Sequence, residues 1–179
     1  EPLSPAKRTL EDAYRTASDL TYLISLQNNS NAPFTDLTVQ DNLGAFTPAG
    51  AAAPVQPLTY TGPAELYVNG VFAQTLTPAV TEDGVTFTLP SLPAGSNALI
   101  LYKARVNGFA PLEPDSEITN TVAVGEQNAS ASVPVDSYAD VSIEKDMSPN
   151  PIDAGAELTV TFTIENRGNV AATDLVLVD

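Results

Sequence analysis

The sequence predicts an all-β protein, built as an antiparallel β-sandwich that is repeated in tandem along the chain. Three observations lead to this prediction. Nearly every segment of the 179 residues alternates apolar and polar residues with a period of two, which is typical of half-buried strands. Turn signals separate these segments, and no helical crossover lies between them. The third observation is an internal repeat, because 19–41 and 157–179 align without a gap.

The internal repeat has the length of a whole domain. Extending the alignment back to Lys7 and Lys145 gives an offset of 145 − 7 = 138 residues, with nine identities in thirty-five aligned positions. In the first copy the identical positions are Lys7, Leu20, Thr21, Asn28, Asn31, Thr35, Asp36, Leu37 and Asp41. A repeat of this length has its own core and is not a solenoid unit. We expect a complete repeat over 1–136 and the opening strands of a second, truncated repeat over 137–179, within a longer protein.

The strands are expected in order along both copies. Period-two alternation places them at 19–27, 34–40, 65–69, 71–77, 84–89, 97–106, 117–124, 138–145, 156–165 and 173–178. Asn69-Gly70 separates two of them as a two-residue hairpin turn, because both residues tolerate positive φ. Residues 44–57 are small and of low complexity, which predicts a long loop. Residues 126–137 lead to the second repeat, with room for one edge strand.

The opening segment carries two conflicting signals. Ser4 and Pro5 form a helix start signal, and Leu10 and Tyr14 follow at helical spacing. The aligned segment of the second copy instead favours a strand and a proline-rich turn. We expect a strand through Lys7 and a helical turn over 9–16.

Strand parity places three polar residues in line with core residues. The first unit should have about seven to nine strands, and its expected core residues are Leu20, Tyr22, Ile24, Leu37, Val39, Phe87, Leu101, Ile118 and Val122. Three polar residues, Lys7, Asp41 and Asn120, share these inward faces. In the second copy, Lys145 aligns with Lys7 and Asp179 aligns with Asp41. Burying such groups unpaired costs several kcal/mol each.

A lysine, an acid and an asparagine together suggest a covalent chemistry. A neutral lysine amine can attack the asparagine side-chain carbonyl, release ammonia and leave an isopeptide bond. Burial favours both the neutral amine and the protonated acid that polarises the amide, and the fold holds the partners in contact. The alternative is three ordinary polar strand ends, with Lys7 reaching solvent, Asp41 capping a turn and Asn120 bonding the backbone.

Composition excludes several function classes. Seven basic residues against 22 acidic ones give a net charge of −15, so the chain lacks the basic face that nucleic acids and anionic membranes attract. The chain has no cysteine and no histidine, which excludes cysteine and histidine proteases, thiol redox chemistry and ordinary zinc sites. No apolar run is long enough to cross a bilayer. We therefore expect no nucleic-acid partner, no direct membrane contact in this segment, no metal and no cofactor.

Several motifs resemble those of known surface proteins. In the first copy they are Asp19-Leu20-Thr21-Tyr22, Thr35 to Asp41, Leu92-Pro93-Ala94-Gly95 and Ile118-Thr119-Asn120-Thr121-Val122. In the second copy they are Lys145, Ala154-Gly155-Ala156-Glu157-Leu158-Thr159, Asn166-Arg167-Gly168 and Thr173 to Asp179. As a set they resemble the repeat domain of bacterial and archaeal surface proteins known as domain of unknown function eleven. They are also similar to the isopeptide-bearing domains of Gram-positive adhesins and pilins.

The resemblance implies an immunoglobulin-like sandwich, strung in tandem in an extracellular protein of the cell surface or cell wall. It places Lys7, Asp41 and Asn120 where such domains carry the bond-forming lysine, the aspartate and the asparagine. The function that it favours is a non-catalytic structural stalk or spacer, whose partners are neighbouring repeats of the same chain and host or cell-wall ligands.

An adhesin or carbohydrate-binding module is the alternative function. Sugar platforms generally use exposed aromatic side chains, and in this tryptophan-free chain the candidates are Tyr60, Tyr67 and Tyr102. Packing between strands explains these tyrosines equally well. An enzyme is not expected, because no set of motifs converges on a catalytic site.

Overall fold

A computed structural model describes all residues, 1–179, as two compact units, Glu1–Val135 and Asp136–Asp179. Both units are built from strands, and the structure contains no helix that is long and apolar enough to span a membrane. The predicted all-β class is confirmed.

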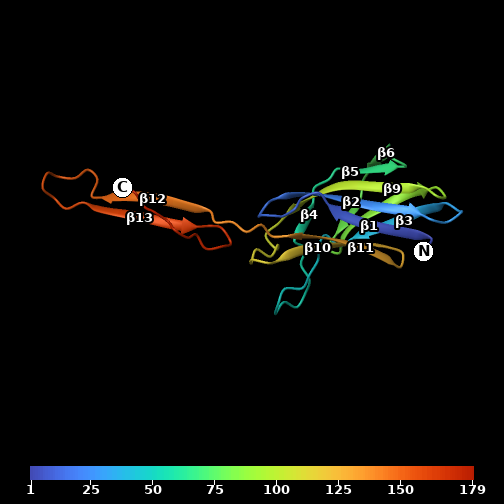
Figure 1. Cartoon of the computed structure of the whole chain (residues 1–179), viewed down its shortest axis with the longest axis horizontal. Coiled ribbons are helices and arrows are strands. Elements are labelled where there is room, and N and C mark those ends of the chain that lie inside the picture. The colour runs from blue at the N-terminus through green and yellow to red at the C-terminus, as the bar shows by residue number, and fades with distance from the viewer. The chain divides into compact units, whose positions relative to one another are not determined.

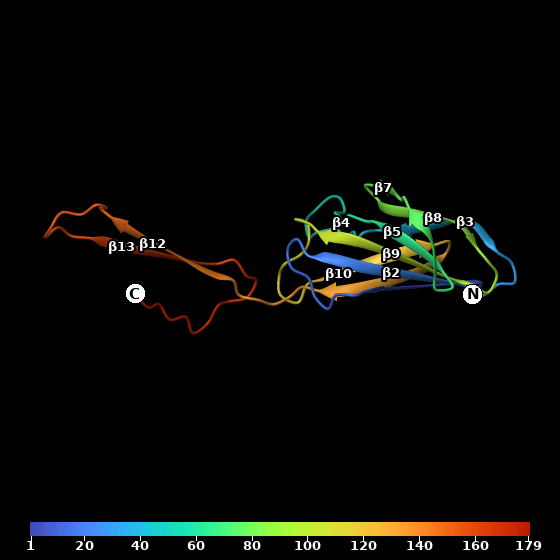
Figure 2. The same ribbon diagram turned by 90° about the horizontal axis from the view of Figure 1, so that it is seen from above.

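Two antiparallel sheets face each other in the first unit (Figures 1 and 2). The strand order is β1-β2-β9-β5-β6 in the first sheet, with β4 also paired to β9, and β11-β10-β3-β8-β7 in the second. The strands are β1 (Leu3–Thr9), β2 (Asp19–Asn28), β3 (Phe34–Asp41), β4 (Leu58–Tyr60), β5 (Ala64–Val68), β6 (Val71–Leu76), β7 (Ala79–Thr81), β8 (Gly84–Leu92), β9 (Asn97–Val106), β10 (Glu117–Val124) and β11 (Gln127–Pro134).

The first unit has more strands than the sequence predicts, eleven in place of seven to nine. Strands β4 and β7 have three residues each, which is too short to show an alternating pattern. Strand β11 lies in the segment where one edge strand was expected, and it pairs along the whole of β10. The long loop over 44–57 leaves the sandwich between β3 and β4, and a bridge between Phe46 and Val55 closes its base (Figure 1).

The predicted helical turn over 9–16 is wrong. Tyr14 is 1% exposed and forms a parallel bridge with Val135, and its backbone N–H donates to Pro134 O at 3.0 Å. The Glu11 side chain accepts a 2.8 Å hydrogen bond from the backbone N–H of Thr21 on β2. These tertiary contacts tie the segment to β2 and to the end of β11, and they override its local helix propensity.

Most of the expected core residues are buried, and two are not. Leu20, Tyr22, Ile24, Val39, Phe87, Ile118 and Val122 are all at most 1% exposed. Leu37 is only half-buried, and Leu101 lies on the outer face of β9. The inward-facing residues of β9 are Ala98, Ile100, Tyr102, Ala104 and Val106. The prediction for Leu101 is off by one residue, because Leu99 and Leu101 lie on the outer face of this strand and interrupt its alternation of apolar and polar residues.

The second unit is a hairpin of β12 (Val141–Ser148) and β13 (Thr159–Asn166) that has the same register as β1 and β2. Lys145 lies opposite Phe162 just as Lys7 lies opposite Ile24, with both positions shifted by 138 residues. The similarity extends beyond the strands. The Asn28 side chain donates to Ala32 O at 2.9 Å, and the aligned Asn166 donates to Val170 O at 2.8 Å.

A strand was predicted over 173–178, and none forms there. The aligned strand of the first unit, β3, is held between β8 and β10, and the second unit contains no counterparts of these two strands. A strand without hydrogen-bonding neighbours leaves its backbone groups unpaired.

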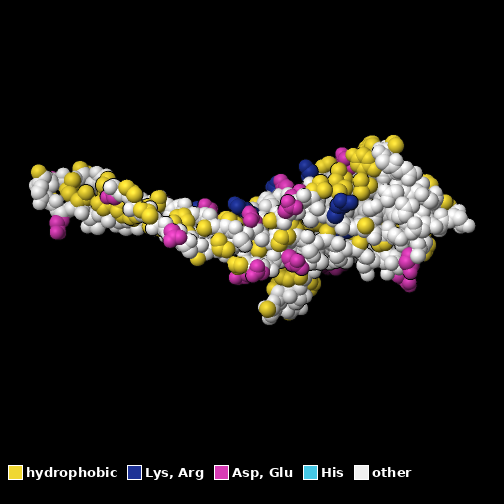
Figure 3. Space-filling model, in the orientation of Figure 1, with side chains coloured by type: hydrophobic (Ala, Val, Ile, Leu, Met, Phe, Trp, Pro, Cys, Tyr) yellow, Lys and Arg dark blue, Asp and Glu magenta, His cyan; other side chains and the backbone are white.

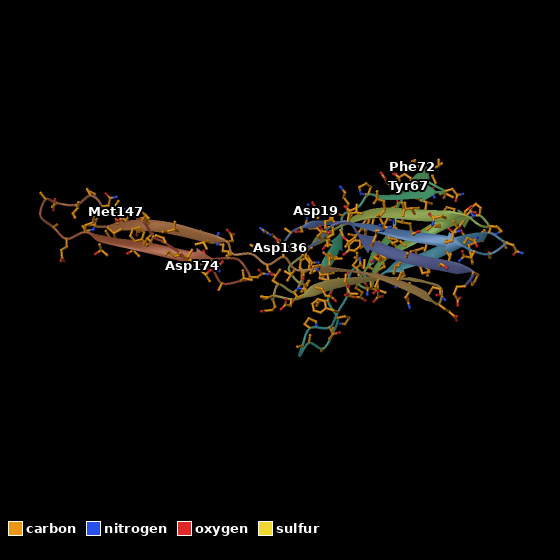
Figure 4. The ribbon with its side chains drawn as sticks, viewed as in Figure 1. Asp19, Tyr67, Phe72, Asp136, Met147 and Asp174 are labelled. Atoms are coloured by element: carbon orange, nitrogen blue, oxygen red, sulfur yellow. The ribbon has the colours of Figure 1, made fainter.

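Apolar side chains that are buried in the first unit have exposed counterparts in the second. Leu20, Leu26 and Val39 are each 0% exposed, whereas the aligned Leu158, Ile164 and Leu177 are 44%, 49% and 48% exposed. Figure 3 shows hydrophobic side chains along the surface of this unit, and Met147 projects from β12 in Figure 4. A single hairpin with one uncovered apolar face is only marginally stable in water.

We therefore expect limited proteolysis with thermolysin to cleave within 136–179 well before it cleaves the sandwich. The reason is that protease sensitivity follows local opening, and the hairpin lacks the buried contacts that resist opening. Mass spectrometry should detect a stable fragment that ends near Val135. Digestion at rising protein concentration is the control, because protection that appears only at high concentration would indicate pairing with a second copy. Equal resistance of both units in a dilute monomer would contradict this expectation.

Candidate functional site

A buried ion pair connects the two sheets of the first unit. Lys7 extends inward from the edge strand β1, and Asp41 is the last residue of β3 in the opposite sheet. The Lys7 Nζ lies 2.6 Å from Asp41 Oδ2, and both side chains are 0% exposed. Strand parity therefore turned both side chains inward as predicted, and the alternative in which Lys7 reaches solvent is wrong.

The end of β3 is shaped to hold the Asp41 carboxylate. Its second oxygen, Oδ1, accepts a 3.0 Å hydrogen bond from the backbone N–H of Leu43. On the neighbouring strand β8, Gly84 adopts φ 126°, and a Cβ at that position would lie 2.0 Å from the Asp41 backbone oxygen. Only glycine allows this close approach of the two backbones.

Asn120 joins the same site through a tyrosine. The Tyr102 hydroxyl, from β9, donates to Asp41 Oδ2 at 2.5 Å. The Asn120 Nδ2, from β10, donates to the Tyr102 hydroxyl oxygen at 3.0 Å, and the Asn120 Oδ1 accepts from Gly44 N–H at 3.2 Å. Asn120 is 0% exposed and Tyr102 is 1% exposed. The structure thus brings the three predicted residues into one buried hydrogen-bonded cluster, from Lys7 through Asp41 and Tyr102 to Asn120.

Burial sets the protonation of this cluster. It lowers the pKa of Lys7 from 10.5 to about 8, against the opposing effects of the Asp41 charge and hydrogen bond. Burial also raises the pKa of Tyr102 well above 10.0, and the negative charge of Asp41 adds to this rise, so the hydroxyl stays neutral. The Tyr22 ring lies 5.0 Å from the Lys7 ammonium and stacks on Tyr102 with ring centroids 5.5 Å apart. The lysine therefore sits in a buried site that is walled by aromatic rings.

Tyr102 is the site residue that the sequence analysis did not identify, since the roles considered for it were a sugar platform and packing between strands. Its burial removes it from any such surface. Tyr60 packs against the core with its ring 6.1 Å from that of Tyr102, and Tyr67 bonds Glu65 and lies beside Phe72 on β5 and β6 (Figure 4). The three tyrosines do not share an exposed face. The available signal was the alternation of β9, which turns Tyr102 inward, where its hydroxyl needs a partner.

The second unit repeats the ion pair in an exposed setting. Lys145 Nζ lies 2.5 Å from Asp179 Oδ1, at the positions aligned with Lys7 and Asp41. The two side chains are 44% and 55% exposed. Exposed pairs contribute little to stability, so this contact alone does not hold the second unit together.

Comparison with known proteins supports the fold. No known family matches the sequence, so the resemblance to the surface repeat domain is not confirmed. No curated protein matches it either. Among solved structures, BcpA, the major pilin subunit of Bacillus cereus, is similar over 95% of this chain, with a TM-score of 0.54 and 13% identity. The pilus backbone RrgB of Streptococcus pneumoniae is similar over 68% of it, with a TM-score of 0.51 and 13% identity.

The chain spans 56% of the length of BcpA and 31% of that of RrgB. At this level of identity the likeness shows a common fold. The immunoglobulin-like sandwich is therefore one that pilin domains also adopt.

Removing one partner of the ion pair should destabilise the fold much more than replacing both partners with apolar residues. With every variant compared in an Asn120→Ala background, where no isopeptide bond can form, Asp41→Ala should lower the free energy of unfolding by about 3–5 kcal/mol, because the Lys7 charge stays buried without its partner. The double variant Lys7→Met/Asp41→Leu should recover most of this loss, since it removes both charges and keeps the volume. Urea unfolding followed by circular dichroism measures both values. A double variant as unstable as Asp41→Ala would contradict the account.

Proposed function

We propose that this chain is a structural stalk or spacer module of an exported cell-surface protein, and that an isopeptide bond between Lys7 and Asn120 locks its complete sandwich. The observation that supports the bond most directly is the buried cluster that joins these residues through Asp41 and Tyr102. The pilin fold supports the stalk role. The exported location and the role in spacing rest on that likeness of fold.

The cluster supplies what amide transfer to a lysine requires. The lowered pKa of Lys7 makes its neutral amine easier to form. Asp41 lies in position to accept the proton that the ammonium must lose. The Gly44 N–H already donates to Asn120 Oδ1, where negative charge develops when the amine attacks. The new bond joins Lys7 Nζ to Asn120 Cγ, the Cγ–Nδ2 bond breaks, and ammonia leaves. The reaction happens once per molecule, without turnover.

The bond would connect the two sheets and shorten the path of a pulling force. Lys7 lies in β1 of the first sheet, and Asn120 lies in β10 of the second. It would close a loop of 120 − 7 = 113 residue steps. A force applied at the two ends of the unit would then pass from β1 directly to β10. Such a cross-link suits a cysteine-free stalk, because it does not depend on an oxidising compartment.

We also propose that Asp136–Asp179 is the opening of a second copy of the sandwich. The common register of β12–β13 and β1–β2, and the repeated Lys145–Asp179 pair, support this proposal. The apolar face of this hairpin matches the face of β1 and β2 that the opposite sheet covers in the first unit. The partners of the module would then be neighbouring repeats of its own chain.

Intact-mass measurement tests the bond. The folded chain should be lighter than its sequence mass by one ammonia, and Lys7→Ala or Asn120→Ala should restore the full mass. These variants should also melt at a lower temperature, because a loop of this size contributes roughly 4–5 kcal/mol on the chain-entropy model for cross-links. Lys103→Ala is the matched control, since it removes the only other lysine of the unit, which is exposed. An unmodified wild-type mass would disprove the bond.

Single-molecule pulling tests the mechanical role. When the first unit is pulled from its two ends, the wild type should release only the residues outside the closed loop. Lys7→Ala should release a further 113 residues, which is roughly 370–410 Å of chain at 3.3–3.6 Å per residue. Lys103→Ala should behave as the wild type. Equal extension of the wild type and Lys7→Ala would contradict the role even if the mass shows the bond.

A further inference from the structure

A continuous hydrogen-bonded path joins the two nitrogen atoms that the proposed reaction exchanges. Lys7 Nζ, the attacking atom, contacts Asp41 Oδ2 at 2.6 Å. The same oxygen accepts from the Tyr102 hydroxyl at 2.5 Å, and that hydroxyl accepts from Asn120 Nδ2, the leaving nitrogen, at 3.0 Å. Tyr102 is therefore the one side chain between the acid and the leaving group.

We propose that Tyr102 is a catalytic residue, which carries the proton taken from Lys7 by Asp41 onto the departing nitrogen of Asn120. This inference rests on the proposed isopeptide bond and assigns a further residue to its formation.

The steps balance in atoms and charge. Lys7 first gives one proton to Asp41, and the neutral Nζ adds to Asn120 Cγ. In the tetrahedral intermediate Nδ2 is an amine with a free electron pair. Asp41 then donates its proton to the Tyr102 oxygen while the Tyr102 proton moves to Nδ2. The Cγ–Nδ2 bond breaks and releases ammonia, and the second proton of Nζ passes to Asp41, which ends neutral.

A tyrosine suits this relay better than the other side chains of the site. Its hydroxyl accepts and donates at once, so the direction of both hydrogen bonds can reverse without movement of the ring. Its raised pKa keeps it neutral throughout. Bulk solvent does not reach the relay, because Asp41, Tyr102 and Asn120 are each at most 1% exposed.

The relay also fixes the sign of the pH dependence. The reactive pair, a neutral Lys7 and a protonated Asp41, holds the same number of protons as the ion pair, so raising the pH does not create it. The titratable side chains around Lys7 are Asp41 on β3, Tyr22 on β2 and Tyr102 on β9, and Glu11 acts on Tyr22. Above about pH 8 the pair loses its shared proton. The rate should therefore fall roughly tenfold per unit above this pH, whereas it would rise with pH if formation of the neutral amine alone limited it.

The test follows bond formation during cell-free synthesis of the full chain, with timed samples quenched in acid and read by intact mass. Tyr102→Phe should slow the loss of ammonia by roughly 100-fold or more, as expected for removal of a proton-transfer group. Tyr60→Phe is the matched control, because its ring packs on Tyr102 while it lies outside the hydrogen-bonded path, and it should react at the wild-type rate. Melting curves of both variants check that they fold.

The pH profile separates a relay from a purely structural role. Tyr102→Phe should show a lower rate at every pH with the decline still beginning near pH 8, since Lys7 and Asp41 are intact. A shifted profile would mean that Tyr102 only shapes the Lys7 environment, and would overturn the relay. Wild-type kinetics in a folded Tyr102→Phe would also overturn it while leaving the bond established. A wild type that never loses ammonia would instead disprove the proposed function itself.

Discussion

The buried contact between Lys7 and Asp41 is the constraint on which the rest of the sandwich depends. Two opposite charges with no solvent exposure face each other across the two sheets. Removing both from water is costly, and the cost is offset only when the geometry is close and the remaining polar atoms are satisfied. In this structure the two charges are in direct contact, and the Asp41 oxygens also accept from the Leu43 N–H and the Tyr102 hydroxyl. The contact thus links β1 of one sheet to the end of β3 in the other.

The polar cluster also specifies how the strands pair. A slip of one residue along β3 would turn Asp41 to solvent and leave Lys7 buried alone. A slip along β9 would turn Tyr102 outward and separate Asp41 from Asn120. A purely apolar core would tolerate such errors better, because hydrophobic contacts are not directional. The conserved register between β1–β2 and β12–β13 within this one chain shows the same pairing formed twice from sequences with few identical residues.

Much of this arrangement could be predicted from the sequence, and the failures have physical causes. Period-two alternation located the long strands and turned Asp41 and Asn120 inward, because one face of each strand is apolar and the other polar. The same rule failed for Leu101, because β9 carries two leucines on its outer face. The helical signal over 9–16 was local, whereas Tyr14 is held by contacts with the far end of the unit. Tyr102 was missed because its partner, Asp41, is 61 residues away, and no local pattern reports such a contact.

The positions of Lys7 and Asn120 in the chain have a consequence for the order of events during synthesis. The lysine lies in the first strand and the asparagine in the tenth of eleven, so at 5–20 residues per second they emerge roughly 6–23 s apart. During that interval the lysine is in water, where its ordinary pKa of 10.5 keeps it protonated and inert. The amine becomes reactive only when the sandwich closes around it. Under the proposed chemistry, the presence of the bond in a molecule would thus show that its Glu1–Val135 unit had folded.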